Sequence, residues 1–417
     1  MAPDRDTPLY GQQTRLSFEN FPAPGRAFGD VGEFVRNYAL VKLAAARANQ
    51  AVGVLDVSRA DAIAQACTQI ADGLHGTEFP SALVLGGGGT TTNMNVNEVV
   101  AALASRLGGI DVHPNDHVNA SQSTNDTYPT AMALTVLDLV ARPLAALDEL
   151  AVALLRKAAE FDETPHLGRT CLRDAVTVTA GQTHRAQAAA IQRAAEGLRS
   201  AAEQLTSVPI GATAVGTGLG APDGYAEVCL TELVAVTGHE LRPAPDLFDA
   251  LAHLDPYAAV AGAGARAGIT LAKIAADVRL LSSGPAGGIG DLTIPAVQAG
   301  SSIMPAKVNP ATPEYVMQLS YRIRGAANTV EYAVAAGELE LNVMEPVIVD
   351  ALVSIFADLT GAATAFARRC VAGLAWDGPR REANLAGALD SWVTLSTESG
   401  YDEAAARYRK TPPPASR

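Results

Sequence analysis

The sequence is poor in charged residues, aromatic residues and cysteines. Of its 417 residues, 18% are charged and 5% are aromatic, whereas 48% are apolar. The four cysteines, Cys67, Cys171, Cys229 and Cys370, are scattered and form no Cys-x-x-Cys pair. This spacing argues against a disulfide framework and against a zinc site. We therefore expect no metal and no cofactor, and a chain of this length can bury a large core without them.

Positive charge is also scarce. Lys and Arg total 31 against 44 Asp and Glu, which leaves a net charge of −13 at pH 7, and only five residues are lysines. Such a chain is poorly suited to bind nucleic acid through a basic surface. The first residues do not resemble a signal peptide. The two longest uncharged stretches, 79–97 and 204–222, are interrupted by Gly, Pro and polar residues and predict no membrane span. We expect a cytoplasmic protein without nucleic-acid or membrane partners.

Long helical patterns dominate the middle of the chain, where strand signals are almost absent. Two earlier helices, 31–50 and 59–74, alternate with loops rich in Gly and Asn. Helices with so little charge bury several faces, which predicts an all-α bundle that oligomerises. The last seven residues, TPPPASR, are predicted to be disordered. The predicted long helices are 131–161, 182–205, 225–237, 256–282, 313–337 and 346–371.

Three polar segments interrupt these helices. Residues 86–98, GGGGTTTNMNVNE, offer backbone N–H groups, hydroxyls and amides that suit a carboxylate or phosphate, although a plain turn is the simpler interpretation. Residues 113–130 carry many hydrogen-bonding side chains before the longest helix, of which helix capping explains only one. Residues 284–310 contain Lys307 beside a Ser-Ser pair and an Asn. A Ser/Lys nucleophile and base or an anion clamp with a Ser base would both fit.

The third segment carries a specific resemblance. GSSIMPAKVNP, residues 300–310, resembles the signature GSSxMPxKxNP of the aspartase/fumarase superfamily. SQSTNDTYPTAM (121–132) and GTTTNMNVNEV (89–99) are similar to two further family motifs, as are GRTCLRDAV (168–176) and ELNVMEP (340–346). MPxKVNP and HPND are typical of the branch that holds aspartase and class II fumarase. The resemblance covers residues 9–405.

The resemblance implies an all-α fold in three parts and a homotetramer whose active sites are shared between subunits. The parts are an N-terminal domain of helices and loops at 1–122, a central bundle of long helices at 123–377, and a shortened C-terminal domain at 378–417. The implied reaction is a reversible anti elimination from a succinyl-type dicarboxylate, which gives fumarate.

The resemblance also implies roles for residues of the polar segments. Ser301 would be the base, with an alkoxide favoured by loop N–H groups and nearby positive charge. Preorganised donors must stabilise the enediolate formed from one carboxylate. These donors would be Thr90, Ser123, Thr124 and Ser302. The other carboxylate would be held by Thr170, Lys307 and Asn309. Further substrate contacts would be Asn93, Asn125, Cys171 and Glu314, with Asn125 at the leaving group.

Residues His113, Asn115 and Asp116 match a secondary dicarboxylate site of fumarases. A capped turn is the alternative interpretation of the same three residues.

One departure from the family pattern bears on the substrate. The family usually carries His or Gln at the position of Cys171, and in fumarases that His pairs with a Glu that matches Glu314. Hydroxide needs an acid to protonate it as it leaves, whereas an alkylammonium already carries its proton. The loss of the His therefore favours an ammonia lyase acting on aspartate or a substituted aspartate. The alternatives are a fumarate hydratase, a lyase for another leaving group, and a weakly catalytic relative kept for binding or structure.

Overall fold

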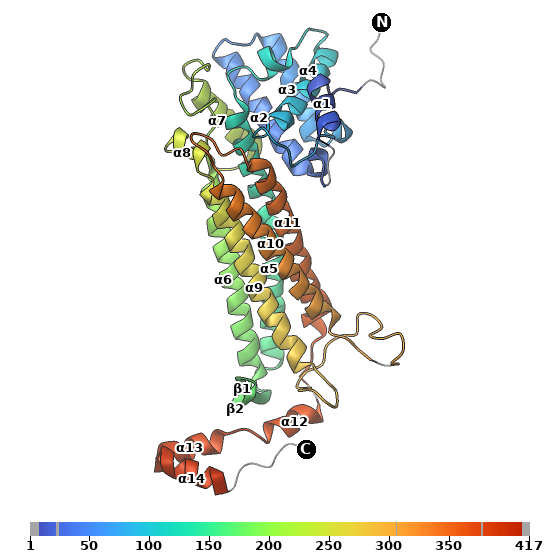
Figure 1. Cartoon of the computed structure of the whole chain (residues 1–417), viewed down its shortest axis with the longest axis vertical. Coiled ribbons are helices and arrows are strands. Elements are labelled where there is room, and N and C mark those ends of the chain that lie inside the picture. The colour runs from blue at the N-terminus through green and yellow to red at the C-terminus, as the bar shows by residue number, and fades with distance from the viewer. Residues whose placement is uncertain (1–7, 22–24, 306, 377, 411–417) are drawn as a thin grey trace. The chain divides into compact units, whose positions relative to one another are not determined.

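The structure is a computed structural model that describes residues 8–21, 25–305, 307–376 and 378–410. These residues are mainly helical, so the all-α prediction is confirmed (Figure 1). The shorter helices are α1 (Gln12–Asn20), α2 (Gly32–Ala51), α3 (Val57–Ala71), α4 (Thr90–Gly108), α7 (Tyr225–Thr237), α8 (Leu247–Ala252), α12 (Pro379–Leu385), α13 (Asp390–Ser399) and α14 (Tyr401–Lys410).

Five long helices lie close to their predicted ranges. They are α5 (Thr124–Glu160), α6 (Ala180–Glu203), α9 (Asp255–Leu281), α10 (Ala311–Ala335) and α11 (Glu345–Arg369). Helix α5 starts seven residues before the predicted start at residue 131. The prediction placed Pro129 just before the helix, but Ser123 and Asp126 cap it upstream. Asp126 Oδ1 accepts the Ser123 N–H (3.0 Å) and Ser123 Oγ accepts the Asn125 N–H (3.2 Å), an arrangement close to a capping box.

The middle region also contains a few short strands, among them a hairpin that the sequence analysis did not predict. Strands β1 (Pro165–Thr170) and β2 (Arg173–Thr179) form an antiparallel hairpin. The alternating Val-Thr-Val-Thr run of β2 explains the hairpin, because β-branched residues fit a pleated surface. A two-residue parallel pair joins β3 (Ser207–Val208) to β4 (Arg242–Pro243).

The chain forms two compact units, each built from three separate stretches. Unit 1 comprises 1–141, 198–264 and 325–356, and unit 2 comprises 142–197, 265–324 and 357–417. Each long helix contributes residues to both units. The division into three contiguous domains at 1–122, 123–377 and 378–417 remains a prediction.

An aromatic cluster forms part of the core of unit 1. Phe28, Phe34, Tyr38, Phe79 and Tyr128 are all buried. Most of their ring pairs meet edge to face, with centroids 5.1 to 6.3 Å apart, the geometry that aromatic quadrupoles favour. The cluster fixes α2 against the start of α5.

The helices of unit 2 pack closely where their residues are small. A Cβ on Gly268 of α9 would meet the Ile323 side chain of α10 at 3.4 Å, so these two helices are in van der Waals contact. Arg368 of α11 donates two hydrogen bonds to the Glu149 carboxylate of α5, at 2.6 and 2.8 Å. These contacts form the bundle that the sequence predicted.

The C-terminal segment of unit 2 packs on the hairpin. Arg381 Nη1 donates to the Pro165 carbonyl (2.6 Å), and the Leu389 N–H donates to the Ala175 carbonyl (2.8 Å). The predicted disorder of residues 411–417 lies outside the described residues.

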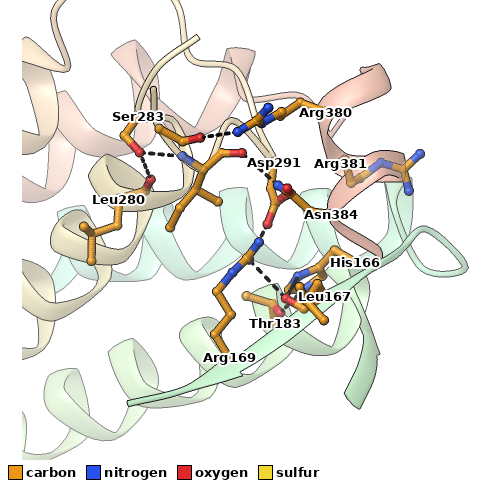
Figure 2. A network of polar contacts seen from close by, with 12 residues as sticks. His166, Leu167, Arg169, Thr183, Leu280, Ser283, Asp291, Arg380, Arg381 and Asn384 are labelled. Atoms are coloured by element: carbon orange, nitrogen blue, oxygen red, sulfur yellow. Dashed lines mark hydrogen bonds and ion pairs between the residues drawn. The ribbon is translucent and has the colours of Figure 1, made fainter. Parts of the chain in front are cut away.

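A buried ion pair joins the hairpin to the loop that precedes the signature segment. Arg169 Nη1 lies 2.5 Å from Asp291 Oδ2, and the Asp291 side chain is fully buried. Asn384 of α12 donates to Asp291 Oδ1 (2.7 Å) and to the Ile289 carbonyl (2.8 Å) (Figure 2). Asp291 therefore connects three stretches of unit 2 that are distant in sequence.

Two of the helices, at 124–160 and 345–373, are long and apolar enough to cross a membrane by length and composition. In their most apolar windows 67% and 56% of the residues are buried inside the protein, and core helices of soluble proteins pass the same test.

We predict that Asp291→Ala lowers the free energy of unfolding by about 3–5 kcal/mol, because it leaves the buried Arg169 guanidinium without its carboxylate. Denaturant titration measures this loss. Asp162→Ala is the matched control, since Asp162 pairs with Arg185 at the surface and such pairs contribute up to about 1 kcal/mol. Similar losses for both variants would contradict the central role of Asp291.

Candidate active site

The signature segment forms a loop that closes on itself. The Gly300 N–H donates to the Lys307 carbonyl (3.1 Å), and Asn309 Nδ2 donates to the Gly300 carbonyl (2.7 Å). A Cβ on Gly300 would lie 2.1 Å from the Lys307 carbonyl oxygen, so only glycine allows this closure. Asn309 thus fastens the base of the loop.

Within this loop, the Ser301 hydroxyl is surrounded by backbone donors. Its Oγ accepts the N–H groups of Ile303 (3.2 Å) and Met304 (2.9 Å). Hydrogen bonds to the charged form favour ionisation, so these donors would stabilise an alkoxide. The neighbouring Ser302 and Lys307 side chains are exposed.

The β1–β2 turn presents Cys171 to solvent. Thr170 pairs with Arg173, and the two residues between them, Cys171 and Leu172, have φ of 52° and 57°. A type I′ hairpin turn requires positive φ at both central residues and normally has Asn or Gly there. Left-handed backbone at ordinary L-residues is strained, and such strain clusters at functional sites. Both side chains are exposed, Leu172 by 72%.

Glu314 lies in the first turn of α10 and faces a cation. Its Oε1 accepts a hydrogen bond from Arg279 Nε at 3.2 Å, from the last turn of α9. The carboxylate that pairs with His in fumarases therefore has a guanidinium as its partner in this chain.

In unit 1, Asp126 organises the second polar segment. Its buried Oδ2 accepts the N–H groups of Gly211 (3.2 Å) and Thr213 (3.0 Å), and Asn125 Nδ2 donates to the Ala214 carbonyl (2.7 Å). The start of α5, with Ser123 and Thr124, is therefore fixed to the 211–214 loop. Burial raises the pKa of Asp126 to about 6, although these N–H bonds and Lys42 act in the opposite direction.

A buried lysine, Lys42, forms hydrogen bonds to the same segment. Lys42 Nζ donates to Asn119 Oδ1 and Gln122 Oε1, both at 3.0 Å. Asn119 Oδ1 also accepts from the amides of Asn93 and Asn97, both at 3.1 Å. Burial lowers the pKa of Lys42 to about 7.

The sequence interpretation missed both Lys42 and Asp126. Lys42 could have been found, because it is a single lysine inside the apolar run Ala39–Ala46 of a predicted helix. Asp126 lies inside the motif at 121–132, but its individual hydrogen bonds cannot be predicted from the sequence.

The first polar segment divides into exposed and buried residues. Thr90 starts α4, is exposed, and donates its hydroxyl to the Gly87 carbonyl (2.8 Å). Asn93 is 3% exposed, and its Oδ1 accepts from the Tyr38 hydroxyl (3.3 Å). Asn93 is therefore buried together with the amides of Asn97 and Asn119 and does not lie on an open surface.

The residues of the predicted secondary site form a surface turn. His113 Nδ1 accepts the Asp116 N–H (3.1 Å) at the start of a single π-helical turn at Pro114–Val118. His113, Asn115 and Asp116 are all exposed. This geometry is what a capped turn predicts, and the secondary site stays a prediction.

The predicted site residues thus fall into two groups. Unit 1 holds Thr90, Asn93, His113, Asn115, Asp116, Ser123, Thr124 and Asn125. Unit 2 holds Thr170, Cys171, Ser301, Ser302, Lys307, Asn309 and Glu314.

Comparison with known proteins gives a consistent result. Residues 4–325 match the model of a protein family described as lyases. The aspartate ammonia-lyase of Escherichia coli strain K12 is 41% identical over 372 residues, which span 88% of this chain and 78% of the relative. The chain belongs to the aspartase/fumarase family of lyases. The class II fumarate hydratase of Mycobacterium tuberculosis strain H37Rv is also 41% identical, over 401 residues that span 95% of this chain and 84% of the relative.

Solved structures agree with this assignment. A fumarate lyase:delta crystallin from Brucella melitensis bound to cobalt has a TM-score of 0.93 and 39% identity, over 97% of this chain and 89% of that one. A class II fumarase from Schistosoma mansoni has a TM-score of 0.93 and 34% identity over the same shares. In the part of the chain that the structure describes, no group of three or more His, Cys, Asp or Glu side chains is placed to hold a metal ion.

We predict that the buried Lys42 gives this lyase a pH-dependent stability. Between pH 7 and 10.5 the unfolded chain keeps the Lys42 proton that the folded chain has lost, so stability rises with pH, by up to about 1.4 kcal/mol per pH unit. Below pH 7 both states are protonated and this contribution to the slope vanishes. Denaturant titrations at pH 7 and 9 should show a smaller rise for Lys42→Met than for the wild type.

Lys273→Met is the control, because Lys273 is exposed on α9. If the free energy of unfolding of Lys42→Met rose with pH as steeply as that of the wild type, burial would not lower the pKa of Lys42.

Proposed function

We propose that this lyase eliminates ammonia or an amine from aspartate or a substituted aspartate and releases fumarate. The supporting observation is the exposed Cys171 at the strained hairpin turn, where the family usually has His or Gln. A thiol is a weak hydrogen-bond donor, so Cys171 is a poor replacement for a His that would assist the departure of hydroxide. A departing ammonium group needs no such acid.

In the proposed reaction, the Ser301 alkoxide takes the proton from the carbon next to one carboxylate and becomes a hydroxyl, while the electron pair of that C–H bond passes into the carboxylate to give the enediolate. That electron pair then returns to form the new double bond, and the C–N bond breaks with its electrons staying on nitrogen. The ammonium then leaves as a neutral amine near Asn125. The intermediate enediolate would be stabilised by Thr90, Ser123, Thr124 and Ser302. The second carboxylate would be held by Thr170 and Lys307, with Asn309 fixing the loop that carries Lys307.

Fumarate hydration is the second candidate. It is supported by the class II fumarate hydratase relative, whose identity of 41% equals that of the aspartate ammonia-lyase. The pairing of Glu314 with Arg279 argues against it, because a glutamate held by a guanidinium is less available to position a histidine or a water. A carbon–oxygen lyase remains the alternative for the same residues, as does a lyase for another leaving group.

We also propose that the enzyme is a homotetramer with shared active sites. Large apolar or aromatic side chains are exposed on α10 (Tyr332, 78%), in the signature loop (Ile303, 84%) and in the segment between α10 and α11 (Leu339, 89%). Such side chains are typical of surfaces covered by another subunit. The low charge of the long helices supports the same arrangement.

The proposed reaction predicts new absorbance in the fumarate band when purified enzyme receives aspartate or an N-substituted aspartate, and much less with malate. Ser301→Ala should abolish this signal without changing the fold, because it removes the base. Circular dichroism of the variant controls for the fold. Near-normal turnover by Ser301→Ala would exclude Ser301 as the base, and faster reaction with malate would favour the hydratase.

For Cys171 we predict an effect on the choice of leaving group rather than on catalysis as such. Cys171→His and Cys171→Gln should shift the ratio of rates between malate, aspartate and the best substrate, because they add a stronger donor beside the leaving group. Cys171→Ser should keep most of the activity. The measurement is kcat/KM for each substrate and variant. A uniform change for all substrates would make Cys171 a packing residue.

A further inference from the structure

A pocket of about 420 Å³ lies in unit 2 beside the signature loop. The signature loop contributes Lys307, the loop that follows α9 contributes Ser283 and Gly290, and α12 contributes Arg380. Lys307 and Arg380 are its charged lining residues, and no Asp or Glu lines it among the described residues. In a chain with a net charge of −13, this local excess of positive charge favours an anionic occupant.

Arg380 has hydrogen-bonding capacity to spare. A guanidinium has five N–H donors. Arg380 Nη2 donates to the Gly288 carbonyl at 3.3 Å, while its Nε is buried without a partner among the described residues. Figure 2 shows Arg380 reaching from α12 toward the loop that carries Ser283. Polar groups left buried and unpaired are costly, so a ligand that accepts from this guanidinium would recover free energy.

The surrounding loop makes room for this side chain. Gly290 has φ of 64°, and a Cβ there would lie 3.0 Å from Arg380 Cγ. A Cβ on Gly288 would lie 2.3 Å from the carbonyl carbon of Ser283, so this loop is closed as tightly as the signature loop. The two glycines allow the stem of Arg380 to lie against the loop.

Helix α12 is held in place by its neighbours. Asn384 donates to Ile289 and Asp291, and Arg381 donates to Pro165. Arg380 directly precedes Arg381 on this anchored helix, so its approach to the pocket is set by the fold. A fixed side chain loses less conformational entropy when it binds a ligand.

We propose that Arg380 is a substrate-binding residue, which shares with Lys307 the carboxylate at this end of the succinyl substrate. The planar guanidinium accepts a carboxylate in bidentate fashion, and the Lys307 ammonium adds a point charge. This inference rests on the proposed function, because that function makes Lys307 a carboxylate ligand. It makes the C-terminal segment, through α12, part of the substrate site.

Succinate tests the proposal, because it has both carboxylates and no leaving group, so its binding does not depend on turnover. Isothermal titration of the full-length enzyme with succinate, at constant ionic strength, should show about 10- to 100-fold weaker binding for Arg380→Gln, the usual loss for a charged hydrogen bond. Arg380→Lys should lose at least about threefold, since lysine keeps the charge but not the bidentate geometry. Arg407→Gln, on α14 outside the pocket, should bind within twofold of the wild type.

Succinate affinity of Arg380→Gln within twofold of the wild type would overturn the proposal, and so would an equal loss in Arg407→Gln. If Arg380→Gln does not fold, Arg380→Lys decides the question, and an unchanged affinity overturns the proposal. Succinate binding could depend on Arg380 although the enzyme forms fumarate from none of the succinyl substrates. That result would refute the proposed reaction but not the role of Arg380. Amine elimination with a KM that Arg380→Gln leaves unchanged would refute the role of Arg380 alone.

Discussion

The candidate site residues of unit 2 depend on the buried carboxylate of Asp291. It receives Arg169 from the hairpin and Asn384 from α12, while its own loop leads into the signature segment. The hairpin carries Cys171, α12 carries Arg380, and the loop leads to Ser301 and Lys307. A buried charge of this kind is expensive to leave unpaired, so Asp291 favours the arrangement in which these segments lie together.

In unit 1, two buried ionisable side chains hold the polar segment in place. Lys42 and Asp126 are both fully buried, and burial moves the pKa of each toward neutrality, to about 7 and about 6. Replacement of buried charged groups by apolar side chains of similar size is often stabilising in proteins. Their hydrogen bonds hold Asn119, Gln122 and the start of α5 in one arrangement. Buried charged groups that lower stability are typical of functional sites, where side chains must be held in one arrangement.

Much of the helical architecture could be predicted from the sequence, because long periodic stretches with little charge are typical of buried helices. The predicted start of α5 at residue 131 was too late, because the hydrogen bonds of the capping residues Ser123 and Asp126 begin the helix at Thr124. The hairpin was missed because its Val-Thr alternation is short. The family motifs identified candidate residues such as Ser301 and Lys307, but Arg380 lies outside every motif. Only the packing of α12 brings it to the pocket.

The four cysteines differ sharply in accessibility. Cys67, Cys229 and Cys370 are buried, and burial raises the pKa of each thiol to about 12, which suppresses the reactive thiolate. Cys171 alone is exposed, at the tip of the hairpin. The natural sequence therefore offers one position for a thiol-directed fluorophore or spin label, without the removal of competing cysteines. Such a probe would sit beside the proposed leaving group and report directly on motions of the hairpin.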